Sequence, residues 1–275
     1  MRRPERALVL IPLLAAVLLL AGCSRLTFVK TKPEIVKFKK HESPYEVKDS
    51  AATRQRLAEQ ARVDRAWQRL TAGDVEEAGR EASAVLKADQ DNVAAHTIMG
   101  IVQSSRGQAA AAGQHYRRAA ELSPKDPGVI NNYGAWLCGN GSPAEALVWF
   151  DRALALPNYS SPASALANAG GCALQVGQYE RAERDLRKAL ELDPVNAYAL
   201  ASMASNEHRK GRDFEARAFI ERRLAAAPAD AGVLQLAADI ESGLGDKVAA
   251  SRYLQRLGTE FPRQGAANSG DSARP

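Results

Sequence analysis

The residues that could carry chemistry in this chain are its cysteines and histidines, and their spacing argues against catalysis. No two of them have the short spacing that a metal site on a helix needs. The glycines recur at regular intervals and follow no predicted strand, which is where a phosphate-binding loop would lie. We therefore expect a protein that is not an enzyme and that binds neither a cofactor nor a metal. The residues considered are Cys23, Cys138, Cys172, His41, His96, His115 and His208.

Cys23 has a different role, because the residues before it form a secretion signal. The first six residues include three arginines. They precede an apolar run, 7–21, that is too short to cross a membrane comfortably. Leu20-Ala21-Gly22-Cys23 resembles a bacterial lipobox, in which the peptide is cut before the cysteine and the thiol receives lipid. We predict that residues 1–22 are a signal peptide and that acylated Cys23 anchors the protein in a membrane. Ser24, which stands where inner-membrane lipoproteins carry Asp, implies transfer to the outer membrane, with the domain facing the periplasm.

Positive charge is concentrated at the start of the chain. The whole sequence has 37 basic and 32 acidic residues, but the part after residue 48 has 27 and 28. A nucleic-acid-binding domain needs a basic face, so we expect no nucleic-acid partner. Residues 23–50 are predicted to be a lipidated basic spacer that either rests near anionic headgroups or is simply solvated. Residues 263–275 are small and polar and are predicted to be a disordered tail.

Between these segments, small residues recur at a fixed period. A glycine, and the alanine five residues after it, both repeat at steps of 34, 34, 36, 34 and 34 residues. This period is typical of tetratricopeptide repeats, in which two helices are joined by a turn. We predict an all-α fold, a right-handed α-solenoid of six repeats within residues 51–262. The repeats are expected at about 58–90, 92–124, 126–158, 162–194, 196–228 and 230–262.

The middle of the chain is more specific than the repeat period. Asn131–Gly134, Leu137-Cys138, an insertion around Tyr159 and Asn168–Ala173 closely resemble the outer-membrane lipoproteins of type IV pilus biogenesis, the pilotins of the pilus secretin. The resemblance implies a protein, expected to be monomeric alone, that helps the secretin to reach the outer membrane and to form its multimeric pore. The alternative is another helical-repeat lipoprotein, either a general scaffold of the cell envelope or part of the β-barrel assembly machinery.

Two cysteines remain once Cys23 carries lipid, and the periplasm is oxidising. Cys138 and Cys172 fall on the first helices of adjacent repeats, which pack side by side. A Cα separation of about 5.5 Å, typical of disulfides, is therefore reachable. We predict that the two cysteines form a disulfide. The alternative is that both are small buried hydrophobic side chains.

The partner-binding surface is predicted on the concave wall, which the first helices of the repeats build. Exposed positions should lie six and three residues before the small residue of each first helix, and one and four residues after it. In repeats one to three, where they include Gly128, they form an apolar strip with a polar border; in repeats four to six, where they include Ser164, they are more polar. We predict that a secretin segment docks on the strip with Trp67 as its anchor, unless Trp67 is a core residue. The strip comprises Val63, Trp67, Leu70, Ile101 and Ala135, with Thr97 and Asn131 at its border.

Overall fold

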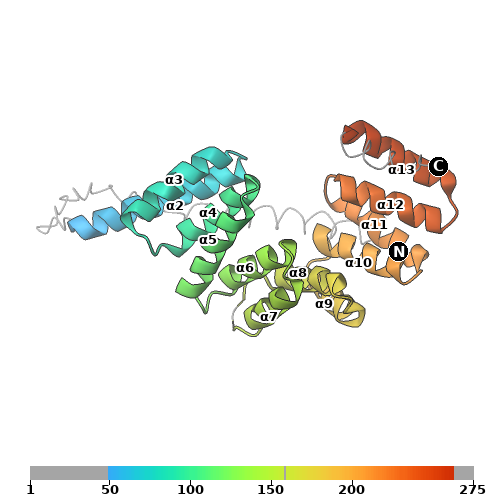
Figure 1. The fold of residues 1–275 in the computed structure, drawn as a ribbon, viewed down its shortest axis with the longest axis horizontal. Helices are drawn as coiled ribbons and strands as arrows, with labels where there is room; N and C mark the ends of the chain where they lie inside the picture. Colours follow the sequence, from blue (N-terminus) through green and yellow to red (C-terminus); the bar gives the residue numbers. More distant parts are fainter. Residues whose placement is uncertain (1–48, 158, 263–275) are drawn as a thin grey trace, which may run out of the picture. The chain divides into compact units, whose positions relative to one another are not determined.

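The chain folds into helix pairs, as the repeat period predicts. The computed structural model describes residues 49–157 and 159–262, and this part of the chain contains twelve α-helices and no strand (Figure 1). None of the described helices is both long and apolar enough to cross a membrane. The predicted signal peptide, Cys23, most of the spacer and the tail lie outside the described residues. In chain order, the pairs are α2 (Ala51–Thr71) with α3 (Val75–Ala88), α4 (Val93–Ser105) with α5 (Ala109–Leu122), α6 (Pro127–Gly139) with α7 (Pro143–Leu154), α8 (Pro162–Gln175) with α9 (Tyr179–Leu192), α10 (Ala197–Arg209) with α11 (Asp213–Ala226), and α12 (Ala231–Gly243) with α13 (Lys247–Glu260).

The glycine of each 34-residue step lies in the turn between the two helices of a pair. Its φ angle is between 71° and 88° in all six repeats. Residues with a side chain larger than a hydrogen atom rarely adopt this left-handed backbone conformation, so the turn favours glycine. The turn geometry thus explains one half of the repeat signature. The six residues are Gly73, Gly107, Gly141, Gly177, Gly211 and Gly245.

The other small residues lie where the two helices of a repeat touch. A Cβ atom on Gly100 would lie 2.7 Å from the ring of Tyr116, and one on Gly134 would lie 2.8 Å from the ring of Phe150. The alanines five residues after the turn glycines are buried in every repeat. Because a larger side chain at either place would push the helices apart, the sequence keeps these positions small.

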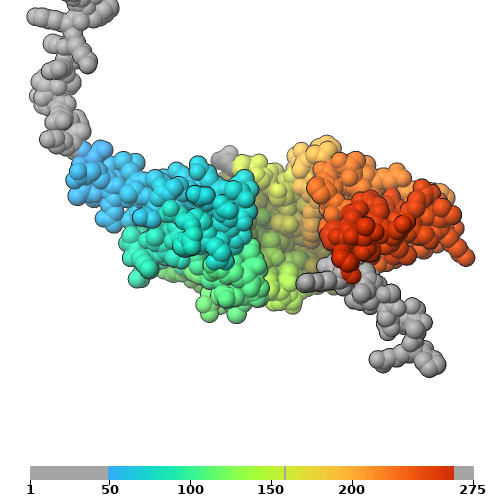
Figure 2. Space-filling model, turned by 90° about the horizontal axis from the view of Figure 1, so that it is seen from above, coloured from blue at the N-terminus to red at the C-terminus, as the bar shows by residue number. Residues whose placement is uncertain are grey.

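Successive repeats stack in chain order, and Figure 2 shows their colours following one another along the domain. Each helix packs on the next one in sequence. The first helices of neighbouring repeats also contact one another, as α2 does with α4, α6 with α8, α8 with α10, and α10 with α12. We interpret this row of first helices as the concave wall that stacked helical repeats form.

The start of the first helix differs from the predicted start of the first repeat. α2 begins at Ala51, ahead of residue 58, because the hydroxyl of Ser50 accepts a hydrogen bond from the Thr53 amide at 3.0 Å and caps the helix. Asn92, Asp126, Asn196 and Asp230 cap the first helices of later repeats in the same way. Similar side-chain caps therefore fix the N-terminal ends of most first helices.

Candidate functional site on the concave wall

Two residues of the predicted strip are buried. Val63 is 3% exposed and packs in the hydrophobic core of repeats one and two. Thr97 is 5% exposed, and its hydroxyl donates to the Val93 carbonyl at 3.0 Å. Their assignment to an exposed groove is wrong, because the position three residues before the small residue faces neighbouring helices. Asn131, which has this position in repeat three, is also buried: it is 8% exposed and bonds to Asn168 of α8, the first helix of repeat four.

The other apolar residues of the strip are partly exposed. Trp67 exposes 39% of its surface and is not a member of the core clusters. Leu70, Ile101 and Ala135 are half-buried, and Leu70 and Ala135 also pack against the cores of their own repeats. The apolar surface is therefore narrower than predicted, and Trp67 provides its largest side chain. The apolar strip thus consists of Trp67, Leu70, Ile101 and Ala135.

A polar cavity of about 720 Å³ lies at the junction of repeats three and four, close to the end of repeat two. Its walls come from the α5–α6 turn, the first turns of α6, the α7–α8 connection and the start of α8. That connection contains the two extra residues in the repeat period, so the insertion builds one wall. Gly128, Asn131 and Ser164, all at predicted concave positions, contribute to the lining. The complete lining is Ser123, Lys125, Asp126, Pro127, Gly128, Asn131, Asn132, Tyr159, Ser160, Ser161 and Ser164.

A hydrogen bond and a disulfide are among the links that hold α6 beside α8. The Nδ2 group of Asn168 donates to Oδ1 of Asn131 at 3.1 Å. Two helical turns farther along α6, the structure joins Cys138 to Cys172 of α8 by a disulfide, with their Cα atoms 5.9 Å apart. The two first helices are thus joined at two points, two helical turns apart along α6.

The surroundings of Asp126 and Tyr159 in the cavity affect how these two groups bond. Oδ1 of Asp126 accepts hydrogen bonds from the Gly128 amide at 2.9 Å and the Val129 amide at 3.1 Å. Burial raises the pKa of Tyr159, and the negative charge of Asp126 raises it further. The phenol is therefore protonated at neutral pH and can donate a hydrogen bond. Sequence reasoning did not assign Lys125, Asp126 or Tyr159 to the site, because they come from turns that have no helical period.

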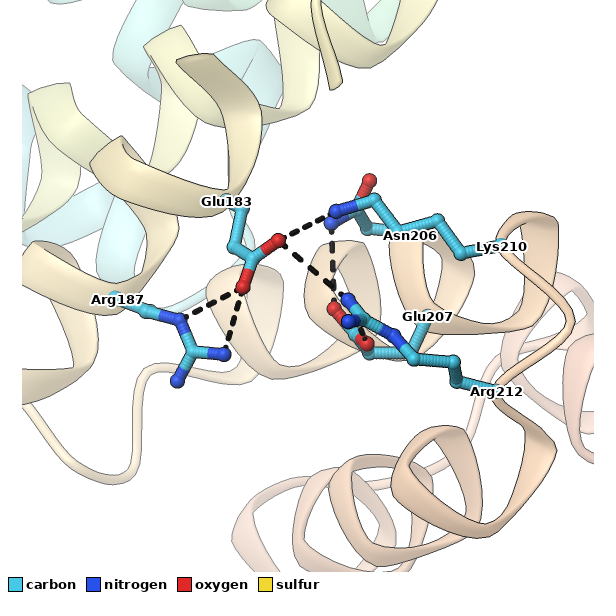
Figure 3. Close-up of polar contacts among 6 residues, drawn as sticks. All are labelled: Glu183, Arg187, Asn206, Glu207, Lys210 and Arg212. Atoms are coloured by element: carbon cyan, nitrogen blue, oxygen red, sulfur yellow. Dashed lines mark hydrogen bonds and ion pairs between the residues drawn. The ribbon is translucent and has the colours of Figure 1, made fainter. Parts of the chain in front are cut away.

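A separate ionic cluster joins repeat four to repeat five (Figure 3). Glu183 of α9 and Glu207 of α10 both pair with Arg212, and Glu183 also pairs with Lys210 at 2.5 Å and with Arg187 at 2.7 Å. Hydrogen bonds from Lys210 and Arg187 lower the pKa of Glu183 to about 2. The bridging cations allow the two carboxylates to lie on facing helices, which is a structural role.

The ionic contact at the next junction, between repeats five and six, is simpler. There Arg217 of α11 stands in place of Glu183 and pairs directly with the buried Glu241 of α12, which stands in place of Glu207. Direct pairing needs no bridging cation. The two junctions therefore satisfy a buried carboxylate on the first helix in different ways, and neither needs a ligand.

Two histidines form a further polar pair within repeat two. Nδ1 of His96 lies 2.9 Å from Nδ1 of His115, and Nε2 of His96 lies 3.0 Å from the Gln90 carbonyl. Because a carbonyl only accepts, His96 carries its proton on Nε2 when it is neutral, and its Nδ1 then accepts from His115. Burial lowers the pKa of His115, and a positive charge on His96 lowers it further. Across the described part of the chain, no group of three or more His, Cys, Asp or Glu side chains is placed to hold a metal ion.

Comparison with known proteins agrees with the repeat fold. Residues 63–127 and residues 163–194 match two sequence profiles of the tetratricopeptide repeat. An uncharacterized protein of Haemophilus influenzae is 27% identical over 146 residues, which cover 53% of this chain and 82% of that protein. Cellulose synthase operon protein C of Pseudomonas fluorescens is 29% identical over 200 residues, which cover 68% of this chain but only 16% of that protein.

Solved structures include two proteins of similar fold. The crystal structure of PilW, a widely conserved type IV pilus biogenesis factor, has a TM-score of 0.66 at 28% identity and covers 74% of this chain and 94% of its own. The structure of Pseudomonas aeruginosa PilF has a TM-score of 0.64 at 22% identity, covering 76% and 94%. The second likeness concerns the fold alone. The predicted helical-repeat fold is confirmed.

Proposed function

We propose that this tetratricopeptide-repeat protein is a pilotin of type IV pilus biogenesis, which binds the pilus secretin and promotes its localisation and multimerisation. The likeness to PilW carries the proposal, because it extends over nearly all of that chain and includes sequence as well as fold. Asn131 and Tyr159, which lie in segments that resemble pilotins, also line the cavity at the junction of repeats three and four, and Asn168 bonds to Asn131. The function is binding, since the repeats build a concave wall and an apolar strip.

The proposed docking surface is the apolar strip of repeats one to three. Trp67 supplies the anchor, and the half-buried Leu70, Ile101 and Ala135 supply further apolar surface on the first helices of repeats one to three. Large aromatic side chains that become buried on binding dominate such interfaces. An amphipathic secretin segment would cover the strip and remove Trp67 from water.

The proposed location is the outer membrane, with the repeats in the periplasm. Cys23 would carry the lipid, and each buried methylene of its acyl chains contributes about 0.8 kcal/mol to membrane binding. Several chains make the anchor stable. The protein would therefore meet secretin subunits at the membrane in which they assemble.

Co-purification from detergent-solubilised envelope tests the proposal. The full-length chain with a C-terminal tag should enrich the secretin relative to an untagged strain. Absence of the secretin from the captured proteins would contradict the pilotin function. Enrichment of β-barrel assembly proteins in its place would favour the alternative, a general scaffold of the envelope.

A further inference from the structure

The two helices of repeat two meet at a pair of histidines. Nδ1 of His96 on α4 lies 2.9 Å from Nδ1 of His115 on α5, and both residues are half-buried. His96 is also held from the α3–α4 turn, because its Nε2 lies 3.0 Å from the carbonyl oxygen of Gln90. The pair therefore joins three segments of the chain: α4, α5 and the turn before α4.

The same two positions carry different side chains in the other repeats. They lie four residues before the small residue of the first helix and eight residues after the turn glycine. Repeat one has Arg62 and Glu81 there, and these form an ion pair at 2.9 Å. Three later repeats have an aliphatic and an aromatic side chain, which do not titrate near neutral pH. They are Ile130 with Trp149, Leu200 with Phe219, and Leu234 with Tyr253.

The contact between the histidines holds a single proton. When both rings are neutral, His115 donates from Nδ1 to Nδ1 of His96, whose own proton is on Nε2. A first additional proton can enter at Nε2 of His115 and leaves the contact intact. A second must enter at Nδ1 of His96, and two N–H donors then face each other without an acceptor. The doubly protonated pair is therefore incompatible with the contact.

The charged groups around the pair are mostly engaged with one another. α6, which packs on α5, carries no charged residue, and the one charge that shifts the pKa of His115 among the described groups is that of His96. No neighbouring carboxylate in the described segments thus favours a second positive charge on the pair. The ion pairs of α3, α5 and the turn between α3 and α4 are Asp91 with Arg118 at 2.5 Å, Arg118 with Glu121 at 3.7 Å, Glu76 with Arg106, Glu77 with Arg80, and Glu81 with Arg62 and Arg65, whereas Asp89 accepts from the Asp91 amide and from Asn92.

We propose that the His96–His115 pair is an acid-sensitive contact, which holds α4 against α5 near neutral pH and separates when both imidazoles are charged. Burial and the charge of His96 lower the pKa of His115 from its ordinary value of 6.5. A histidine whose pKa is lowered on folding takes up its proton more readily in the open form. The stability of repeat two is therefore highest above about pH 6.5 and falls as the pH decreases below it.

The contact would regulate the docking surface, and this part of the inference rests on the proposed function. α4 carries Ile101 as well as His96, and in the order of the repeats Ile101 stands between Trp67 and Ala135 in the apolar strip. Separation of α4 from α5 would disturb the middle of the strip. Acid would therefore weaken the binding of the secretin.

Hydrogen exchange measured by mass spectrometry tests the pair directly. In the full-length chain, amide exchange in α4 and α5 is compared between about pH 7.5 and about pH 5.5, after correction for the pH dependence of the chemical exchange step. We expect the corrected exchange to rise by up to about tenfold for each pH unit below about 6.5, because the open form takes up one further proton. α6 and α7, which carry Ile130 and Trp149 at the equivalent positions, should show no such rise.

Two variants isolate the contribution of the histidines. His96→Leu with His115→Phe gives repeat two the side chains that Leu200 and Phe219 supply in repeat five. His115→Gln keeps an N–H donor for His96 but cannot become charged. The acid-dependent rise in α4 and α5 should be absent from both variants, whose fold is checked by circular dichroism. No rise in the wild type, or an equal rise in a folded variant, would overturn the inference.

Binding of a secretin fragment tests the effect on the docking surface. The full-length chain is titrated with the periplasmic region of the type IV pilus secretin from the same genome, at both pH values. On acidification, the wild type should lose several-fold more affinity than His96→Leu with His115→Phe. Equal losses would overturn the regulation of binding. If the wild type binds the fragment at neither pH, the proposed function is contradicted, and hydrogen exchange alone decides on the acid-sensitive contact.

Discussion

Cys138 of α6 and Cys172 of α8 are joined across the boundary between repeats three and four, with their Cα atoms 5.9 Å apart. Both side chains are buried, and the bond closes a loop with a sequence separation of 34 residues. It therefore links two repeats that are also held together by packing, by the Asn131–Asn168 hydrogen bond and by the ion pair between Arg181 and Asp151.

Removing this bond should lower the stability of the domain. In the chain-entropy treatment, a disulfide that closes a loop of this length stabilises the folded state by about 3–4 kcal/mol. We expect Cys138→Ala with Cys172→Ala to lower the free energy of unfolding by up to that amount, measured by urea denaturation. The control is a thiol titration of denatured, unreduced wild-type protein. Two free thiols in that sample would show that the disulfide does not form.

Two glycines of the same helix should respond in opposite ways to alanine. A Cβ on Gly134 meets the ring of Phe150, whereas one on Gly139 meets nothing within 4 Å. We expect Gly134→Ala to destabilise the domain by about 1–3 kcal/mol. Gly139→Ala should be neutral or stabilise it by up to about 1 kcal/mol, because alanine restricts the unfolded chain. Equal changes in stability for the two variants in thermal denaturation would contradict the close packing of Gly134 against Phe150 between α6 and α7.

Much of the fold could be predicted because two steric requirements recur in every repeat. The turn needs a glycine with positive φ, and the seam needs a small residue opposite a large one, as with Gly134 and Phe150. Both requirements fix residue type at a fixed spacing. The period of 34 residues therefore appears directly in the sequence.

The candidate site could be predicted only in part. Trp67 is exposed as expected, but Val63 is buried, because contacts between neighbouring first helices are tertiary and leave no separate mark in the period. Lys125 and Tyr159 come from a turn and from the insertion. Their convergence depends on how repeats three and four stack, which spacing along one helix does not reveal.

Glu183 should make the stability of the domain depend on acid pH. Its pKa falls from 4.5 to about 2 on folding, chiefly through the hydrogen bond from Lys210. A carboxyl group with a lowered pKa stabilises the folded state fully above pH 4.5, and this contribution is lost as the pH falls toward 2. The difference in unfolding free energy between wild type and Glu183→Gln should therefore be largest above pH 4.5 and shrink below it.

A control on the same helix separates this effect from general acid denaturation. Glu191 is exposed and has no ion pair within the described segments of the chain. Glu191→Gln should change the stability little at any pH. A pH-independent difference for Glu183→Gln would contradict the role of its ion pairs.

Cys23 should determine where the protein is found in the cell. If Cys23 is the acylation site, Cys23→Ser leaves either a soluble periplasmic protein or an uncleaved precursor, because serine accepts no thioether-linked lipid. Fractionation of envelope and periplasm, with the mature mass determined, distinguishes these forms. A Cys23→Ser protein that is processed and fully associated with the outer membrane would contradict the lipid anchor.

In the proposed function, the concave wall of repeats one to three binds the secretin. The most direct measurement is the amount of secretin multimer in cells that carry Trp67→Ala with Ile101→Ala, with Val148→Ala as the control. Val148 is an exposed apolar residue of α7, on a second helix away from the concave wall. We predict that multimers are lost in the double variant and kept in the control, with helical content unchanged by circular dichroism. Normal multimers in a folded double variant would contradict the claim.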